Sequence, residues 1–178
     1  MKRLDIARMN EWIGDLRVGD EVLLCGTVYT ARDAVHKRFA ALMEEGKPLP
    51  IELENAVIYY AGPTPAKNGL AVGSCGPTTS SRMDRHTPAL VKRGLRATIG
   101  KGERSIEVVE ALRTAGGVYF CAIGGAGALY ASCIKSCEVV AFDELGCESL
   151  KKMCVEDFPV IVGVDSLGGN LFDGGKRS

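Results

Sequence analysis

Hydroxyl and guanidinium side chains occur together between residues 73 and 84, where they form a candidate anion site. Thr78 opens a run of four hydroxyl residues, and Arg82 adds a planar fork of donors that suits a carboxylate. The apolar run 70–72 before them predicts a strand, and the helical spacing after them predicts a helix to about residue 93. Free N–H groups at a helix start favour an anion, although such hydroxyls also serve as ordinary helix caps.

Two more cations lie where strands are expected to end. Residues 21–28 form a nearly continuous apolar run, and we place Arg32 in the first turn of the helix that follows. An arginine there opposes the helix dipole, which indicates either a ligand-binding role or a surface salt bridge. Lys101 lies between two glycines after the expected strand 96–100, where it either enters a pocket or belongs to a solvent loop.

The helix after the first strand is predicted from its apolar spacing. One face carries Val35, Phe39, Leu42 and Met43. We interpret Thr30 and Asp33 as a variant capping box, and His36 lies one turn beyond Arg32.

The other expected elements alternate between strands and helices. We expect a short amphipathic helix within residues 1–16, a helix at 105–115, and strands at 55–61, 117–123, 138–142, 152–155 and 159–165. The pattern predicts a single α/β domain over residues 1–178, layered and with a mixed sheet.

Seven cysteines occur without a secretion signal, which predicts reduced thiols and no disulfide framework. We expect Cys25, Cys121 and Cys154 to be buried like small apolar residues. Cys133 and Cys137 are four residues apart and would share a face if both lay on one helix. No CxxC spacing is present, so we expect this chain to bind no metal through these thiols alone.

Composition excludes several partners. The formal net charge is zero and no apolar run is long enough to span a bilayer, so we expect no nucleic acid, no membrane and a cytoplasmic location. Residues 124–127 are rich in glycine but lack a full dinucleotide fingerprint, which favours close backbone packing or an approaching partner there.

Three motifs in order are more specific than any one of them. Residues 26–36 (GTVYTARDAVH), 76–84 (GPTTSSRMD) and 99–102 (IGKG) resemble the β subunit, or C-terminal domain, of class I iron–sulfur fumarate hydratases, a family that includes the L(+)-tartrate dehydratase β subunit. The resemblance extends over about residues 16–171. It implies a swivelling β/β/α domain, richer in strands than the pattern alone predicts.

The resemblance also implies roles for residues and partners. Arg32, Arg82 and Lys101 match ligands of the substrate carboxylates, and Thr78 matches the proposed catalytic base. The implied α subunit carries a [4Fe–4S] cluster, so this chain binds none itself and is expected to be inactive alone. Contacts between two β subunits are implied as well.

The resemblance leaves the substrate open. Fumarate and malate on one side, and tartrate on the other, are both dicarboxylates that need cationic ligands. From the residues alone, a separate anion-binding or nucleotide-binding module is another hypothesis, built on residues 78–82 and 124–127.

Overall fold

The computed structural model describes residues 1–175, and in it one mixed sheet organises the chain. Strands β1 (Lys2–Asp5), β2 (Glu21–Thr30), β3 (Val57–Tyr59), β4 (Ala97–Gly100) and β5 (Val118–Cys121) run parallel, and β6 (Ile134–Ala141) and β7 (Leu150–Val164) complete the sheet with antiparallel pairings. The prediction of an α/β fold with a mixed sheet is therefore confirmed.

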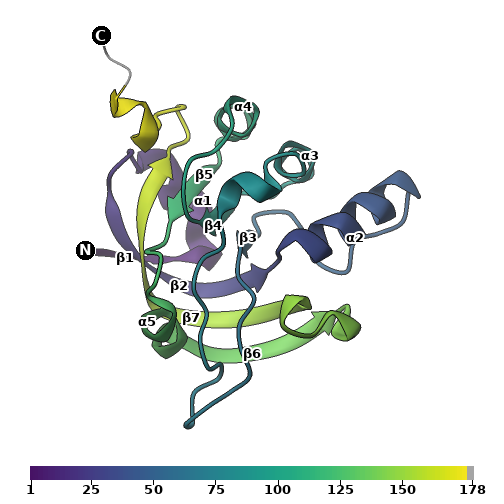
Figure 1. The fold of residues 1–178 in the computed structure, drawn as a ribbon. Coiled ribbons are helices and arrows are strands. Elements are labelled where there is room, and N and C mark those ends of the chain that lie inside the picture. Colours follow the sequence, from purple (N-terminus) through teal and green to yellow (C-terminus); the bar gives the residue numbers. More distant parts are fainter. Residues whose placement is uncertain (176–178) are drawn as a thin grey trace.

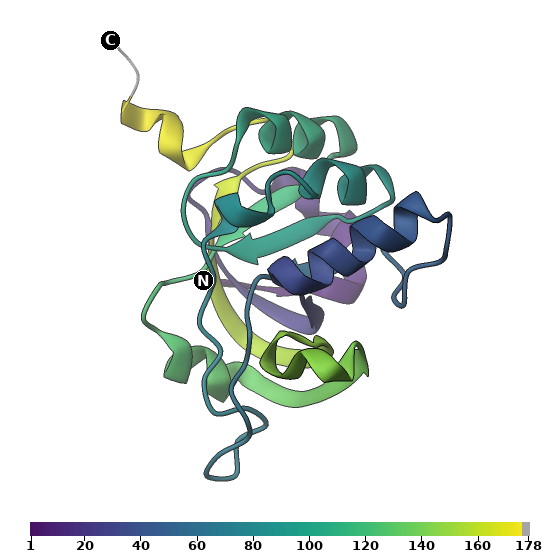
Figure 2. The ribbon, with the colours of Figure 1, turned by 45° about the vertical axis from the view of Figure 1, so that its right-hand side comes forward.

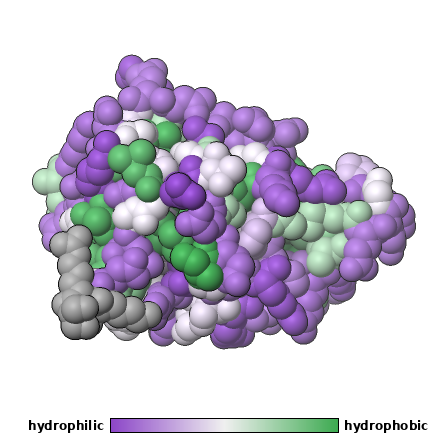
Figure 3. All heavy atoms as spheres, turned by 90° about the horizontal axis from the view of Figure 1, so that it is seen from above, coloured by the Kyte–Doolittle hydropathy of each residue, from purple (hydrophilic) through white to green (hydrophobic). Residues whose placement is uncertain are grey.

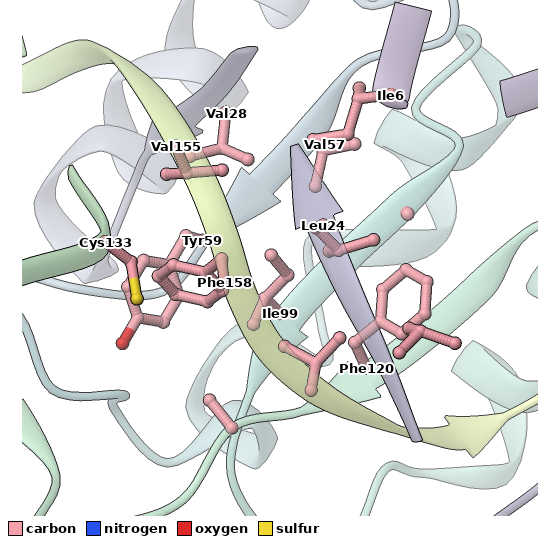
Figure 4. Packing of buried hydrophobic residues seen from close by; sticks show 14 of the residues in the cluster. Ile6, Leu24, Val28, Val57, Tyr59, Ile99, Phe120, Cys133, Val155 and Phe158 are labelled. Carbon is pink, nitrogen blue, oxygen red and sulfur yellow. The ribbon is translucent and has the colours of Figure 1, made fainter. Parts of the chain in front are cut away.

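The sheet closes on itself, which the sequence did not indicate. Strand β7 pairs with β5 near its end and with β2 along most of its length, so β2, β3, β4, β5 and β7 form a ring. Alternate residues of these strands point into the ring; Tyr59, Ile99, Phe120 and Phe158 belong to its core (Figure 4). Their neighbours Ile58 and Tyr119 belong to two other apolar clusters outside the ring. Because these strands are buried on both faces, their sequences are nearly continuous apolar runs.

Helices cover the outside of the ring on one side (Figures 1 and 2). The longer ones are α2 (Asp33–Glu44), α3 (Thr87–Lys92) and α4 (Ile106–Ala115). Helix α5 (Gly127–Cys133) lies apart from these three, beside β6 and β7, and its Tyr130 and Ala131 belong to the core cluster of the ring (Figure 1). Phe39 of α2 packs in the cluster with Ile58, and Leu112 of α4 packs in the cluster with Tyr119. The remaining helical segments are η1 (Ile6–Arg8), α1 (Met9–Trp12), η2 (Ile13–Asp15), η3 (Ser80–Met83), η4 (Asp143–Glu148) and η5 (Leu171–Gly175).

Several predictions for the first half of the chain need correction. The short helix expected within residues 1–16 is only partly right: Lys2–Asp5 is a strand that adds to β2, and three short helical segments follow it over residues 6–15, where the Trp12 indole donates to the Asp5 carbonyl. No strand forms at 70–72, which lies in a long loop. The predicted helix to residue 93 is two pieces, η3 and α3, separated by a turn.

Later predictions also need correction. Strand β7 runs unbroken through Pro159, which faces Leu23 of β2, where the sequence suggested two strands. Cys154 is exposed, and Cys25 and Cys121 are only half-buried. Cys133 ends α5 while Cys137 lies in β6, so they share no helix face. All seven cysteines are free.

The face of the molecule seen from above is mostly polar. Hydrophilic residues dominate the face seen in Figure 3, and apolar residues there form small, separate patches. Among the described residues, no helix combines the length and apolar character needed to cross a bilayer.

Candidate active site

The four residues singled out in the sequence lie at one edge of the sheet. Strands β2, β3, β4 and β5 are parallel, so their carboxyl ends meet at this edge. Arg32 follows the end of β2, and Lys101 follows the end of β4. Thr78 is joined to the end of β3 because its N–H donates to the Tyr60 carbonyl at 2.7 Å. In α/β folds, with open sheets and with closed barrels alike, ligands bind outside the carboxyl ends of parallel strands, which makes this edge the candidate site.

Arg32 is the N-cap of α2, one residue before the first turn in which it was predicted. Its carbonyl accepts from Nδ1 of His36 at 2.7 Å and from the His36 backbone N–H. Thr30 does not cap the helix: it ends β2, and its hydroxyl lies near the backbone of Ser149 and Lys151. The predicted capping box is therefore wrong, and the helix start is fixed by His36.

The Arg32 guanidinium lies against Gly62 and near an acid. A Cβ added at Gly62 would lie 2.7 Å from Nη1 of Arg32. The Nε atom lies 3.6 Å from a carboxylate oxygen of Glu148 and is buried without a hydrogen-bond partner. Arg32 is thus a partly buried cation with unused donors.

Arg82 reaches the same helix from a segment far along the chain. Its guanidinium forms a bidentate contact with Asp33, the first residue of α2. Because Asp33 follows Arg32 directly, the contact brings both arginines to the start of one helix.

Thr78 and Lys101 are tied together through their backbones. The Lys101 N–H donates to the Thr78 carbonyl at 3.3 Å, and the Ser80 N–H donates to the Lys101 carbonyl at 2.9 Å. Thr79 and Lys101 thereby form an isolated parallel bridge beyond the end of β4. The Lys101 side chain is exposed, and the structure records no hydrogen bond of the Thr78 hydroxyl within residues 1–175.

A buried polar network centred on Arg104 lies next to this edge of the sheet, and the sequence analysis did not predict it. Arg104 is 3% exposed and donates to Asp84, Thr98, Tyr60 and Thr87 at 2.7–3.1 Å. Its guanidinium also lies over the rings of Tyr60 and Tyr119. The sequence offers little signal for Arg104, because a charged residue beside a helix start usually lies in solvent.

The positive charge of the site comes from arginine and lysine, not from histidine. Burial lowers the pKa of His36 to about 4, so the ring is neutral at pH 7 and donates through Nδ1 to Arg32. Burial also lowers the pKa of His86, whose ring centroid lies 5.7 Å from that of His36. The cations of this edge are therefore Arg32, Arg82 and Lys101, and the carboxylates of Glu148 and Asp33 lie beside the two arginines.

Two cavities flank the site without including its four residues. A polar cavity of about 730 Å³ is lined by Ser81, Arg104 and several carboxylates, among them Asp84 and Glu110. A more apolar cavity of about 330 Å³ lies between the 63–72 loop and residues of β6, η4 and β7. An acidic lining disfavours a dianion, so the cations at the strand ends remain the better carboxylate site.

The glycine-rich residues 124–127 allow close packing. A Cβ at Gly127 would overlap Oγ of Ser74, and the Cys75 N–H donates to the Gly127 carbonyl at 3.1 Å. This contact holds the base of the long loop that leads to Thr78. Among residues 1–175, no group of three or more His, Cys, Asp or Glu side chains is arranged to hold a metal ion.

Comparison with known proteins identifies the family. The family model described as Fumarase C-terminus matches residues 1–175, and the chain belongs to this family. Fumarate hydratase 2 of Leishmania major is 39% identical over 169 residues, which are 94% of this chain and 30% of that protein. The aerobic class I fumarate hydratase of Escherichia coli K12 is 39% identical over 176 residues, which are 96% of this chain and 32% of that protein.

A third relative has a different length. A provisionally assigned L(+)-tartrate dehydratase subunit beta of Methanocaldococcus jannaschii is 37% identical over 164 residues, which are 89% of this chain and 84% of that protein. The chain thus spans about a third of the fumarate hydratases but most of the tartrate dehydratase subunit. The resemblance in sequence to class I fumarate hydratases and the tartrate dehydratase β subunit is confirmed.

Proposed function

We propose that this chain is the β subunit of a hydro-lyase that interconverts fumarate and L-malate, and that it supplies the carboxylate-binding groups and the base. The observation that carries the proposal is the meeting of Arg32, Arg82, Lys101 and Thr78 at the carboxyl ends of β2, β3 and β4. The names of the class I fumarate hydratase relatives support the reaction.

The two arginines match the two carboxylates of the substrate, and Lys101 adds a third positive charge. Fumarate and malate carry two carboxylates, and Arg32 and Arg82 each offer a planar set of donors for one of them. Proton transfer next to a carboxylate increases the negative charge on that group. Fixed cations that stabilise this charge lower the barrier more than they favour the ground state.

Thr78 requires help to act as a base. An aliphatic hydroxyl loses its proton with difficulty, so the nearby guanidinium charge and a water-poor site must favour its alkoxide. The Thr78 hydroxyl has no recorded hydrogen-bond acceptor within residues 1–175, which supports a proton acceptor from a partner.

The partner is an α subunit that holds a [4Fe–4S] cluster. The described residues of this chain offer no ligand group for a cluster, and the M. jannaschii relative is named as a subunit. We therefore assign cluster binding to the partner and derive no step through the cluster from this chain. A cytoplasmic location and contacts between two β subunits are further parts of the proposal.

The test separates the two subunits. The purified chain alone is expected to show no hydration of fumarate, and activity should appear when an α subunit with its cluster is added without oxygen. Fumarate hydration by this chain alone would contradict the division of roles. Tight nucleotide binding by the isolated chain in calorimetry would instead support a separate nucleotide-binding module.

Tartrate dehydration is the second candidate. It is favoured by one observation: the M. jannaschii relative, 37% identical over 164 residues, is named as an L(+)-tartrate dehydratase subunit beta. Assays of the reconstituted complex with L-malate and L(+)-tartrate decide between them through the ratio of kcat/KM.

A further inference from the structure

Asp33 occupies one side of the Arg82 guanidinium and leaves the other side free. Its Oδ1 accepts from Nε of Arg82 at 3.3 Å, and its Oδ2 accepts from Nη2. Arginine has five N–H donors, one on Nε and two on each terminal nitrogen. The contact uses one donor on Nε and one on Nη2, so three donors remain for another acceptor.

Asp33 is itself held in place more firmly than Arg82. It is the first residue of α2, a helix of 12 residues, where the dipole and the free N–H groups favour a carboxylate. Its side chain is 30% exposed, whereas that of Arg82 is 49% exposed. A long, exposed arginine loses considerable rotamer freedom when it binds a ligand, and a short anchored acid that holds it beforehand reduces that cost.

The two arginines of the site differ in this respect. Arg32 has an acid near its Nε as well, but Glu148 lies 3.6 Å away and forms no hydrogen bond with it. Arg82 is therefore the arginine whose guanidinium is oriented by a bidentate hydrogen-bonded acid, and Arg32 has no such partner among residues 1–175.

We propose that Asp33 is a positioning residue that holds Arg82 with its three free N–H donors available to one carboxylate of the substrate. The inference rests on the proposed function, because it assigns a carboxylate to the free side of Arg82. A different role would be electrostatic: an acid beside the site would compete with a dianion for Arg82, and its removal would then strengthen binding.

The experiment compares Asp33→Asn, Asp33→Glu and the wild-type chain in complex with the α subunit. The probe is succinate, a dicarboxylate without the reacting double bond, used as a competitive inhibitor of fumarate hydration. We expect Asp33→Asn to raise the Ki of succinate and the KM of fumarate about tenfold, the loss of roughly one charge-assisted hydrogen bond. Asp33→Glu should restore part of the affinity. An unchanged or lower Ki in Asp33→Asn would overturn the proposal.

A matched control and an independent signal complete the test. Glu11 accepts from the same two atoms of Arg8, Nε and Nη2, in an exposed pair that involves none of the candidate residues, so Glu11→Gln should change neither constant. In the full chain alone, the Nε–H resonance of Arg82 should be protected from exchange and lose protection in Asp33→Asn.

The outcomes distinguish the two proposals. A wild-type complex that hydrates fumarate, with Asp33→Asn unchanged, refutes the role of Asp33 and leaves the function intact. A wild-type complex that does not hydrate fumarate refutes the function. The exchange of the Arg82 Nε–H then still decides whether Asp33 fixes the Arg82 side chain. Equal protection in the wild-type chain and in Asp33→Asn would overturn the role of Asp33.

Discussion

The hydroxyl of Tyr119 lies 2.9 Å from Oγ of Ser80 and connects β5 to the segment that bears Thr78 and Arg82. The same hydroxyl donates to the Gly102 carbonyl at 2.7 Å. Since a phenol has one proton, Ser80 is the donor in the first bond. Tyr119 therefore fixes both sides of the site, the hydroxyl segment and the loop after Lys101.

Replacing Tyr119 with phenylalanine removes both bonds and leaves the ring in place. We expect the free energy of unfolding to fall by about 1–3 kcal/mol, because Ser80 Oγ stays buried without its acceptor. Urea unfolding measures this change, and the activity of the reconstituted complex should fall as well. Tyr29→Phe is the control, since no hydrogen bond of the Tyr29 hydroxyl is recorded within residues 1–175; an equal loss in both variants would contradict the role of Tyr119.

Arg82→Ala should separate activity from stability. The Arg82–Asp33 pair is partly exposed, and such pairs contribute about 0–1 kcal/mol to stability. The same change removes a cation from the proposed site, so kcat/KM for fumarate should fall by about 10²-fold or more. Urea unfolding and steady-state kinetics check both values. Parallel losses of fold and activity would mean that Arg82 is a structural residue.

Gly62→Ala should displace Arg32 without unfolding the protein. The added methyl group would lie 2.7 Å from Nη1 of Arg32, at the flexible end of the side chain, and 3.3 Å from the Cys147 carbonyl. We expect KM for fumarate to rise about tenfold, with a small change in the unfolding midpoint. Gly14→Ala is the control because nothing lies within 4 Å of its added Cβ, and an effect there as large as at Gly62 would refute the prediction.

His36 predicts a pH dependence of stability. Burial lowers its pKa from the usual 6.5 to about 4; the hydrogen bond to the Arg32 carbonyl and the charge of Asp33 oppose this shift, whereas His86 and Arg104 act in the same direction as burial. Between these two pH values the unfolded chain binds a proton at this site and the folded chain does not. Stability contributed by neutral His36 is therefore fully present above pH 6.5 and declines toward pH 4, by about 3 kcal/mol at most.

The measurement is urea unfolding at several pH values between 4 and 7. His36→Asn keeps an N–H donor for the Arg32 carbonyl but has no group that titrates here. Its stability should depend less on pH in this window than that of the wild-type chain. Identical slopes in the two proteins would show that His36 does not titrate as described.

Alkylation should distinguish the cysteines by exposure. Burial raises the pKa of the Cys75 thiol to about 12, whereas Cys147 and Cys154 are exposed. Iodoacetamide under native conditions should modify Cys147 and Cys154 first and reach Cys75 only after unfolding. Peptide mass spectrometry resolves the sites, and early modification of Cys75 would contradict its burial.

Much of the site was predictable because its residues follow strands. The apolar run before Arg32 and the glycines beside Lys101 mark strand ends, and parallel strands bring their ends together. Asp33 was read only as a helix cap, since a carboxylate in a first turn has a sufficient local explanation. Its pairing with Arg82 depends on contact across 49 residues, which local patterns do not contain.

The closed sheet was unpredictable for a similar reason. The sequence analysis placed two strands at 152–155 and 159–165, with Pro159 at the start of the second, where a residue that cannot donate to a sheet is commonly found. In the structure Pro159 lies opposite Leu23, two residues beyond Asp157, which has a positive φ of 52°. The pairing of β7 with β2 joins distant parts of the chain, and no spacing within either strand indicates it.

The ring of β2, β3, β4, β5 and β7 has a consequence for how the molecule opens. A strand at an open edge can fray alone, but β2 and β7 are each bonded on both sides for much of their length. Their amide protons should exchange with deuterium only when the whole domain unfolds. Arg32 follows β2, and Lys101 follows β4, which is also paired on both sides. The two strands thus belong to one cooperative unit, and thermal fluctuations that loosen surface turns leave the distance between their ends unchanged.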